Sequence, residues 1–173
     1  MRDIQQVAKY IGLSLILKEL TVSPLKLQKL LYYLQAWYMV FFGRENTMFD
    51  DIPQAWVNGP VYPSVYLKYR DLADNMCDHL DATAFTNREL EDALKDLSIE
   101  LNLNKDEEEL IDSIVMLYGS MSQNKLIFLT HSELPWVEAR EGLAPYERSD
   151  KEISLDTMYE FYKNRHDRNK SRA

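Results

Sequence analysis

The sequence predicts a mainly α-helical fold: a compact domain of several helices around one buried central helix, with a small β element near Trp56. Three observations lead to this prediction. Apolar residues recur at helical spacing along most of the chain, the segment from Pro24 to Phe42 is apolar on most sides, and capping residues precede most of the apolar segments. Only around Trp56 does the pattern change to a short strand that enters an Asn-Gly-Pro turn.

The first two helices account for the N-terminal quarter of the chain. Helical spacing of apolar residues predicts a helix from about Ile4 to Leu20. Ser23 is a good N-cap for the next helix, and Pro24 occupies the first helical position, where its missing N–H costs nothing. This helix should run to Phe42 and end at Gly43. Because its apolar residues cover most of its surface, we expect it to be buried against several neighbours.

The segment 47–62 departs from the helical pattern. Its residues Trp56 to Val61 indicate a short strand and a tight turn, since Asn58 and Gly59 tolerate positive φ. Helical spacing resumes at Ser64, and residues 74–85 should form a loop.

The C-terminal half predicts several shorter helices. Thr86 or Asn87 should cap a helix that runs through Leu90, Leu94 and Leu97. Asn104 and Glu107 have the spacing of a capping box for the next helix, which should stop at Gly119. Three further expected N-caps are Ser122, Ser132 and Ser154.

The length of 173 residues predicts one domain, residues 1–162, followed by a basic, flexible C-terminal tail, residues 163–173. The net charge is -8, but residues 161–173 carry five Lys or Arg against one Asp, so the remainder carries -12. An acidic body argues against nucleic-acid binding, except through this tail, because phosphate contacts need clustered cations.

Cysteine content and hydropathy indicate a cytoplasmic protein that does not bind membranes. Cys77 is the single cysteine, so no intramolecular disulfide can form. The longest apolar run, Leu30 to Phe42, is shorter than the roughly 20 residues of a membrane span.

No strong signature of catalysis, cofactor binding or metal binding is present, and we expect a protein that is not an enzyme. Cys77 and His79 lack the second ligand pair of a zinc site, and glycine-rich phosphate loops are missing. His131 beside Glu133 is the most suggestive polar cluster. Either His131 acts as an acid or base near Glu133, or, as we favour, its imidazole hydrogen-bonds a free carbonyl or caps a turn where one helix ends and the next begins.

Aromatic residues are numerous, and one helical core cannot bury so many tyrosine hydroxyls without hydrogen-bond partners. Some of them should therefore lie at the surface and contribute to a protein interface. The alternative is that they pack at the edge of the core. The set comprises Tyr32, Tyr33, Trp37, Tyr38, Trp56, Tyr62, Tyr66, Tyr69 and Trp136.

Four motifs occur in a characteristic order along the chain. They are Ser23-Pro-Leu-Lys-Leu-Gln-Lys-Leu-Leu-Tyr-Tyr33, Ala55-Trp56 with Gly59-Pro60-Val61, Leu126-x-x-Leu-Thr-His131, and Pro135-Trp136-x-x-Ala139-Arg140. Together they resemble the Panacea domain family of SocA-like and GepA-like phage-associated antitoxins. The resemblance extends from about Ile4 to Tyr162.

This resemblance implies a helical domain that binds a cognate protein toxin and neutralises it directly. Two alternatives stay open: an adaptor that delivers a toxin to the ClpXP protease, or a phage- or prophage-encoded regulator or inhibitor of a host enzyme. The family offers no catalytic residues to carry over, so the resemblance implies no cofactor.

Six polar and aromatic residues within or near these motifs are candidates for partner contact. Lys26 and Lys29 interrupt an otherwise apolar helix, so we expect them to mark its solvent or partner side. Leu27, Leu30 and Leu34 should then face the core. The full set of candidates is Lys26, Lys29, Tyr33, Tyr62, Tyr66 and Arg140.

Overall fold

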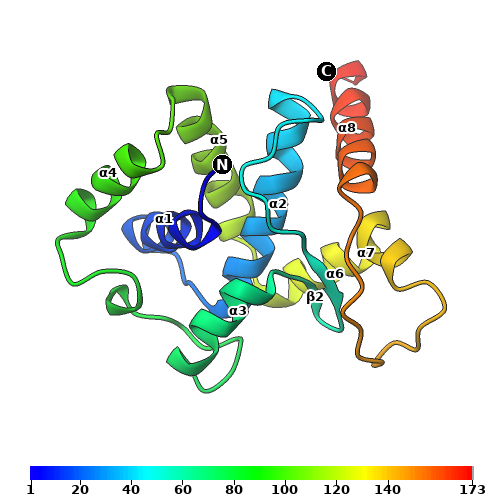
Figure 1. The fold of residues 1–173 in the computed structure, drawn as a ribbon, viewed down its shortest axis with the longest axis horizontal. Coiled ribbons are helices and arrows are strands. Elements are labelled where there is room, and N and C mark those ends of the chain that lie inside the picture. Colours follow the sequence, from blue (N-terminus) through cyan, green and yellow to red (C-terminus); the bar gives the residue numbers. More distant parts are fainter. Residues whose placement is uncertain (173) are drawn as a thin grey trace.

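The computed structural model describes residues 1–172, which form helices around one central helix and a single two-stranded sheet (Figure 1). Both the mainly α class and the small β element near Trp56 are confirmed. The helices are α1 (Ile4–Leu17), α2 (Pro24–Phe42), α3 (Pro63–Tyr69), α4 (Leu90–Glu100), α5 (Lys105–Gly119), α6 (Gln123–Ser132), α7 (Leu134–Ala139) and α8 (Leu155–Ser171), and the strands are β1 (Gln54–Trp56) and β2 (Gly59–Val61).

Helix α2 is the centre of the domain, as its sequence predicts. It contacts α1, α3, α5, α6, α8 and strand β2, and all but four of its 19 residues are buried. Figure 1 shows α2 between α5 on one side and α8 on the other. A helix enclosed in this way must satisfy every polar side chain it carries from within the protein.

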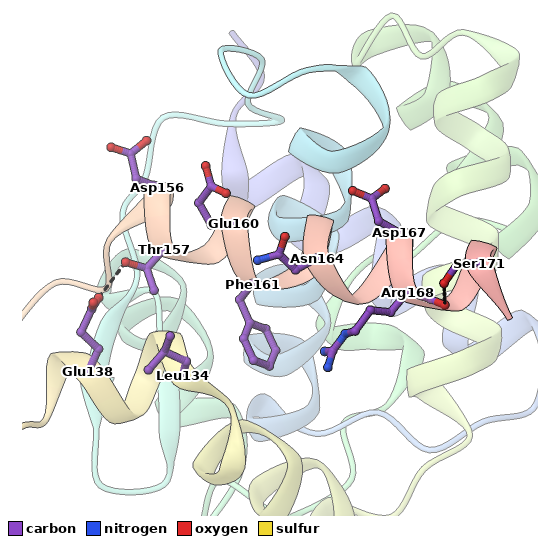
Figure 2. A pocket seen from close by; sticks show the side chains of 10 residues that line it. All are labelled: Leu134, Glu138, Asp156, Thr157, Glu160, Phe161, Asn164, Asp167, Arg168 and Ser171. Atoms are coloured by element: carbon purple, nitrogen blue, oxygen red, sulfur yellow. Dashed lines mark hydrogen bonds between the residues drawn. The ribbon is translucent and has the colours of Figure 1, made fainter.

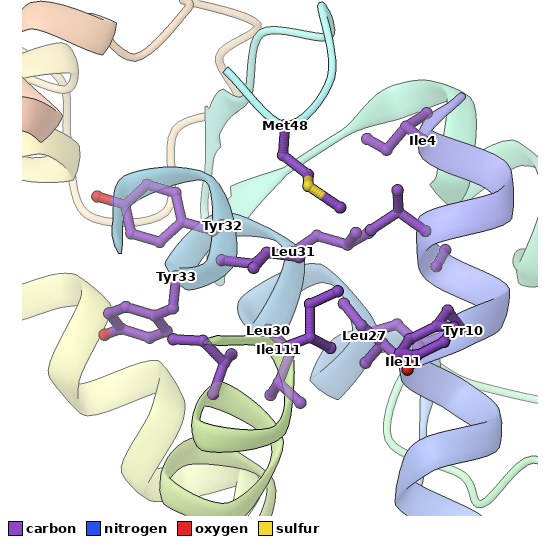
Figure 3. Close-up of a cluster of buried hydrophobic side chains, with 14 of the residues drawn as sticks. Ile4, Tyr10, Ile11, Leu27, Leu30, Leu31, Tyr32, Tyr33, Met48 and Ile111 are labelled. Carbon is purple, nitrogen blue, oxygen red and sulfur yellow. The ribbon is translucent and has the colours of Figure 1, made fainter. Parts of the chain in front are cut away.

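The hydrophobic core lies where α1, α2 and α5 meet. Figure 3 shows Ile11 of α1, Leu27 and Leu31 of α2 and Ile111 of α5 converging, with Met48 from the loop after α2 above them. Tyr32 and Tyr33 extend this layer away from α1. Leu27, Leu30 and Leu34 are fully buried, as expected.

Most helix starts follow the predicted capping chemistry. The Oγ of Ser23 accepts a hydrogen bond from the Lys26 amide at 3.1 Å. Asn104 and Glu107 form the expected capping box, with N···O distances of 2.9 and 3.0 Å. Ser122 and Ser154 also cap their helices.

Two predicted caps are wrong. Helix α4 begins after Glu89, whose carboxylate accepts from the Asp92 amide, so neither Thr86 nor Asn87 caps it. Ser132 is the last residue of α6, where its hydroxyl donates to the Leu129 carbonyl. Residue Glu133 instead precedes α7.

Helix α1 also ends earlier than expected, at Leu17 rather than Leu20. Glu19 has a φ of 58°, in the left-handed region, which stops the helix. The amide of Leu20 then folds back to the Leu15 carbonyl at 2.9 Å.

The expected tail after Tyr162 is instead the continuation of α8, which runs to Ser171. Its basic residues make specific pairs. Arg165 forms an ion pair with Glu133 at 2.6 Å, and Lys163 pairs with Asp167, one turn along, at 2.8 Å. These contacts tie residues 163–171 to the helix and to the body of the domain.

Candidate functional site

A tight β-hairpin lies at the centre of the region that the sequence motifs build. Strands β1 and β2 pair antiparallel, and Trp56 is opposite Gly59 across the turn. Gly59 has a φ of 111°, which L-residues rarely adopt. A Cβ at this position would lie 2.7 Å from the Lys29 Nζ and 2.8 Å from the Thr130 Oγ1, so any other residue would displace these side chains.

Helix α2 holds the hairpin through two polar side chains. The Gln28 Oε1 accepts from the Tyr62 amide at 2.7 Å, and its Nε2 donates to the carbonyl of the same residue at 3.3 Å. The Lys29 Nζ donates to the Pro60 carbonyl at 3.2 Å. These polar residues of the apolar helix therefore hold β2 and the residue that follows it against α2.

Helix α7 and the residue that follows it hold the hairpin from the other strand. Trp136 Nε1 donates to the Trp56 carbonyl at 2.8 Å, and Arg140 Nη1 donates to the Ala55 carbonyl at the same distance. The Arg140 guanidinium also lies over the Trp136 ring and donates to the Glu147 carbonyl at 2.5 Å. Motifs that are far apart in sequence thus converge on one hairpin. We call the residues that hold it, Gln28, Lys29, Trp136 and Arg140, the hairpin clamp.

His131 packs against this clamp and does not pair with Glu133. Its ring stacks on Trp136 with centroids 4.1 Å apart and planes at 11°. Burial lowers the pKa of His131 and the cations Lys29 and Arg140 lower it further, whereas hydrogen bonding of the ring to the Val57 backbone opposes them. Among residues 1–172, no hydrogen bond joins His131 to Glu133, so the acid–base alternative has no geometric support.

Glu133 is the hub of a separate buried network. Its carboxylate, in a residue 2% exposed, accepts from Tyr33 Oη at 2.5 Å, from Tyr162 Oη at 3.1 Å and from Arg165 Nη1 at 2.6 Å. Tyr33 stacks face to face on Tyr118 with centroids 3.9 Å apart. Burial raises the pKa of both Tyr33 and Tyr162, with Glu133 adding to the shift, so both hydroxyls stay protonated donors.

The network joins α2, the α6–α7 junction and α8, and no local sequence pattern identifies Glu133 as its centre. The available signal was the spacing of Tyr162 and Arg165, three residues apart on one face of α8. That spacing shows that the two side chains share a face. It does not show which residue lies opposite.

The sequence predicts that Lys26 and Lys29 mark the solvent or partner side of α2, but they do not face solvent, because both are buried; their contact with a partner stays a prediction. Lys26 Nζ donates to the Gly119 carbonyl at the end of α5, at 2.8 Å, and to Thr21 Oγ1 at 3.1 Å. A cation at a helix C-terminus is favourable because the last carbonyls there carry negative partial charge. Buried carbonyls thus take the place of water for both amines.

The other four candidates also belong mainly to the interior. Tyr33, Tyr62 and Arg140 are buried, and Tyr66 is the one member of the six with a partly exposed side chain. Partner contact by these residues stays a prediction. Tyr33 contributes to the Glu133 network, whereas Arg140 and the Tyr62 backbone contribute contacts to the hairpin clamp. Tyr66 packs edge to face on Trp56.

Two concave regions lie beside these structures. The first is an open groove of about 840 Å³ along α7 and α8, which we call the α7–α8 groove (Figure 2). Figure 2 shows Leu134 and Phe161 on the facing sides of α7 and α8, and Asp156, Glu160 and Asp167 along the outer side of α8. The second, the hairpin pocket, has a volume of about 680 Å³ and lies against the clamp.

Among residues 1–172, no group of three or more His, Cys, Asp or Glu side chains could hold a metal ion, and Cys77 is exposed. The same residues include no helix with the length and apolar character needed to cross a membrane.

Comparison with known proteins places these features in a family. The family described as "Antitoxin SocA-like, Panacea domain" matches residues 27–137, a range that includes the hairpin and most of its clamp. Antitoxin SocA of Caulobacter vibrioides (strain NA1000 / CB15N) is 31% identical over 121 residues, which cover 68% of this chain and 60% of that protein. No solved structure shows significant similarity. Because the match covers well over half of the chain and includes most of the residues that clamp the hairpin, this chain belongs to the SocA-like Panacea domain family of antitoxins.

Proposed function

We propose that this chain is an antitoxin that binds a cognate protein toxin directly and thereby neutralises it. Membership of the SocA-like Panacea family is the observation that carries this proposal. The relative from Caulobacter vibrioides is itself named an antitoxin. The motifs that define the resemblance are occupied in holding the fold together, so toxin contact falls to surface residues outside them.

The α7–α8 groove is the surface that we propose for the toxin. Leu134 is 51% exposed and Val137 is 44% exposed on the short helix α7, and Phe161 lines the groove from α8. Exposed apolar side chains surrounded by charge are typical of protein interfaces. Glu138, Asp156, Glu160 and Asp167 outnumber Arg168 among the charged residues that line the groove, which favours a toxin surface that combines apolar and basic residues.

The test is co-expression with the product of the neighbouring gene, followed by co-purification. Wild-type protein should restore growth and form a stable complex with the toxin. Leu134→Asp should weaken both, because it places a charge in an apolar contact. Leu67→Asp is the matched control, since Leu67 is 57% exposed on α3 and does not line the groove.

The level of toxin in the rescued cells separates neutralisation by binding from delivery to a protease. Binding predicts that the toxin persists in a complex, whereas a ClpX-type adaptor would lower its level. Restored growth without a detectable complex between this chain and the toxin would contradict direct neutralisation, whether the toxin persists or its level falls. An equal loss of complex in the Leu134 and Leu67 variants would instead contradict the groove as the binding surface.

A further inference from the structure

The hairpin pocket contains a buried amine that has no counter-charge. We propose that this pocket binds a carboxylate attached to an apolar or aromatic group, and that the Lys29 amine is the ion-pair partner of that carboxylate. The proposal concerns a site separate from the α7–α8 groove, so it holds whether or not that groove binds a toxin.

The size and walls of the pocket suit a ligand with an apolar part. Its volume of about 680 Å³ lies within the range of roughly 300–1,000 Å³ found for small-molecule sites. Leu25, Val61 and Met76 supply apolar wall. Trp56 and Tyr66 supply aromatic wall and contact each other edge to face, with ring centroids 4.9 Å apart. Aromatic side chains packed in this way present a fixed surface to a ligand.

Lys29 supplies the charge. At 1% exposure it is the least exposed residue that lines the pocket. Its amine can donate three hydrogen bonds, but the structure gives it one, to the Pro60 carbonyl. In residues 1–172 no carboxylate lies within ion-pair distance of it.

Lys26 provides a comparison from the same helix. Its amine is also buried but has two partners, and it does not line the pocket. A buried cation without a counter-charge is costly, so Lys29 either releases its proton or gains an anion. An incoming carboxylate would supply that anion and the missing acceptors.

The pocket rim carries one charge of each sign. Arg148 is exposed and lies beside Asp150, and neither forms an ion pair within the described part of the chain. Arg148 favours an anionic ligand and Asp150 opposes it. Removing the Asp150 charge should therefore strengthen the binding of an acid whose carboxylate lies in this pocket, and should leave the binding of its uncharged amide unchanged.

Binding should also be coupled to proton uptake. Burial lowers the pKa of Lys29 to about 7, with Cys77 opposing the shift, so at pH 8 the amine of the free protein is largely neutral. The other titratable groups near it are His131 on α6 and Asp150 on the rim. An entering carboxylate favours the ammonium form, so the complex should gain a proton.

The experiment titrates the full chain with phenylacetate and with its uncharged analogue phenylacetamide, by calorimetry at pH 8 in two buffers that differ in ionisation enthalpy. We expect the acid to bind at least about tenfold more tightly than the amide and to take up a fraction of a proton. Lys29→Met should abolish both effects, and Lys26→Met, the matched control, should keep them. N-acetylphenylalanine and its amide form a second pair of probes. Tighter binding of N-acetylphenylalanine would indicate a peptide C-terminus as the ligand, and tighter binding of phenylacetate would indicate a small free acid.

A surface variant keeps the proposal testable if Lys29→Met does not fold. Asp150→Asn should fold, because Asp150 is exposed, and should raise the affinity for phenylacetate several-fold while leaving phenylacetamide unchanged. Equal binding of acid and amide would overturn the proposal. So would an acid preference that survives Lys29→Met, or the lack of binding by all four probes at millimolar concentration.

Discussion

The Glu133 network makes a quantitative prediction about stability. Replacing Glu133 with Ala removes the acceptor for two buried tyrosine hydroxyls and the ion-pair partner of Arg165. Tyr162 keeps a contact to Tyr32 Oη at 3.3 Å, whereas the structure gives the Tyr33 hydroxyl no second partner. The variant therefore leaves a buried donor unsatisfied.

The magnitude follows from these contacts. Each hydroxyl bond to a charged carboxylate contributes about 1.5–3 kcal/mol, so the two contribute about 3–6 kcal/mol. The Arg165 pair adds about 0–1 kcal/mol, because that side chain is 35% exposed and can be hydrated when the pair is lost. Relief from burying a carboxylate offsets part of the sum. We expect a net loss of about 3–5 kcal/mol, the range found when one partner of a buried pair is removed.

The assay is urea unfolding at pH 7, supported by thermal unfolding. A loss of about 3–5 kcal/mol corresponds to a fall in Tm of about 6–20 °C for a chain of this size. Glu133→Gln should cost less, because the carboxamide keeps the shape and still accepts a hydrogen bond. Glu138→Ala, at an exposed position whose carboxylate accepts from Thr157, is the control and should change stability by less than about 1 kcal/mol. If the Glu133 and Glu138 variants were equally stable, the reasoning from burial would be refuted.

Three further predictions concern the hairpin and its clamp. Because the pKa of Lys29 falls from 10.5 unfolded to about 7 folded, the unfolded chain holds an extra proton between these values. The contribution of Lys29 to the free energy of unfolding therefore rises with pH between these two values, by at most about 1.4 kcal/mol per pH unit. Urea unfolding of Lys29→Met at several pH values from 7 to 9.5 should give an unfolding free energy that rises less steeply with pH than that of wild type. An identical slope would contradict the lowered pKa of Lys29. Gly59→Ala should lose more than about 2 kcal/mol in the same assay, from a φ of 111° and a Cβ 2.7 Å from Lys29 Nζ. Gly142→Ala is the control, because Gly142 also has a positive φ, 83°, but an added Cβ there would have no atom within 4 Å; it should lose only about 1 kcal/mol. Equal losses in the Gly59 and Gly142 variants would show that the Lys29 side chain moves away from the added methyl group at no cost. Arg140→Lys should cost about 2–4 kcal/mol, because one amine cannot reach both the Ala55 and Glu147 carbonyls. Hydrogen exchange should then speed up at the β1 and β2 amides, and unchanged exchange there would argue against the clamp.

The sequence is most predictive where the signals are local. The bounds of α2 follow from Ser23, Pro24 and Gly43, because N-cap, N1 and C-cap preferences act within one helical turn. The capping box at Asn104 and the short strand and tight turn near Trp56 are predicted correctly for the same reason, although the sequence pattern does not predict that two strands pair there.

The parts that sequence reasoning misses depend on contacts between distant segments. Helical periodicity shows that Lys26 and Lys29 interrupt an apolar surface, but not that carbonyls of Gly119 and Pro60 meet their amines. Glu133 joins residues 100 and 29 positions away, and no local pattern identifies such a hub. The basic composition after Tyr162 likewise conceals the Arg165 contact that helps to extend α8.

The proposed binding of this chain to a protein toxin, for which the product of the neighbouring gene is the candidate, is the central claim, and calorimetric titration of the two purified proteins tests it most directly. The account predicts a saturable complex that Leu134→Asp weakens and Leu67→Asp does not, in parallel with the loss of growth rescue. A toxin that is neutralised in cells while showing no affinity for the folded chain would contradict the account.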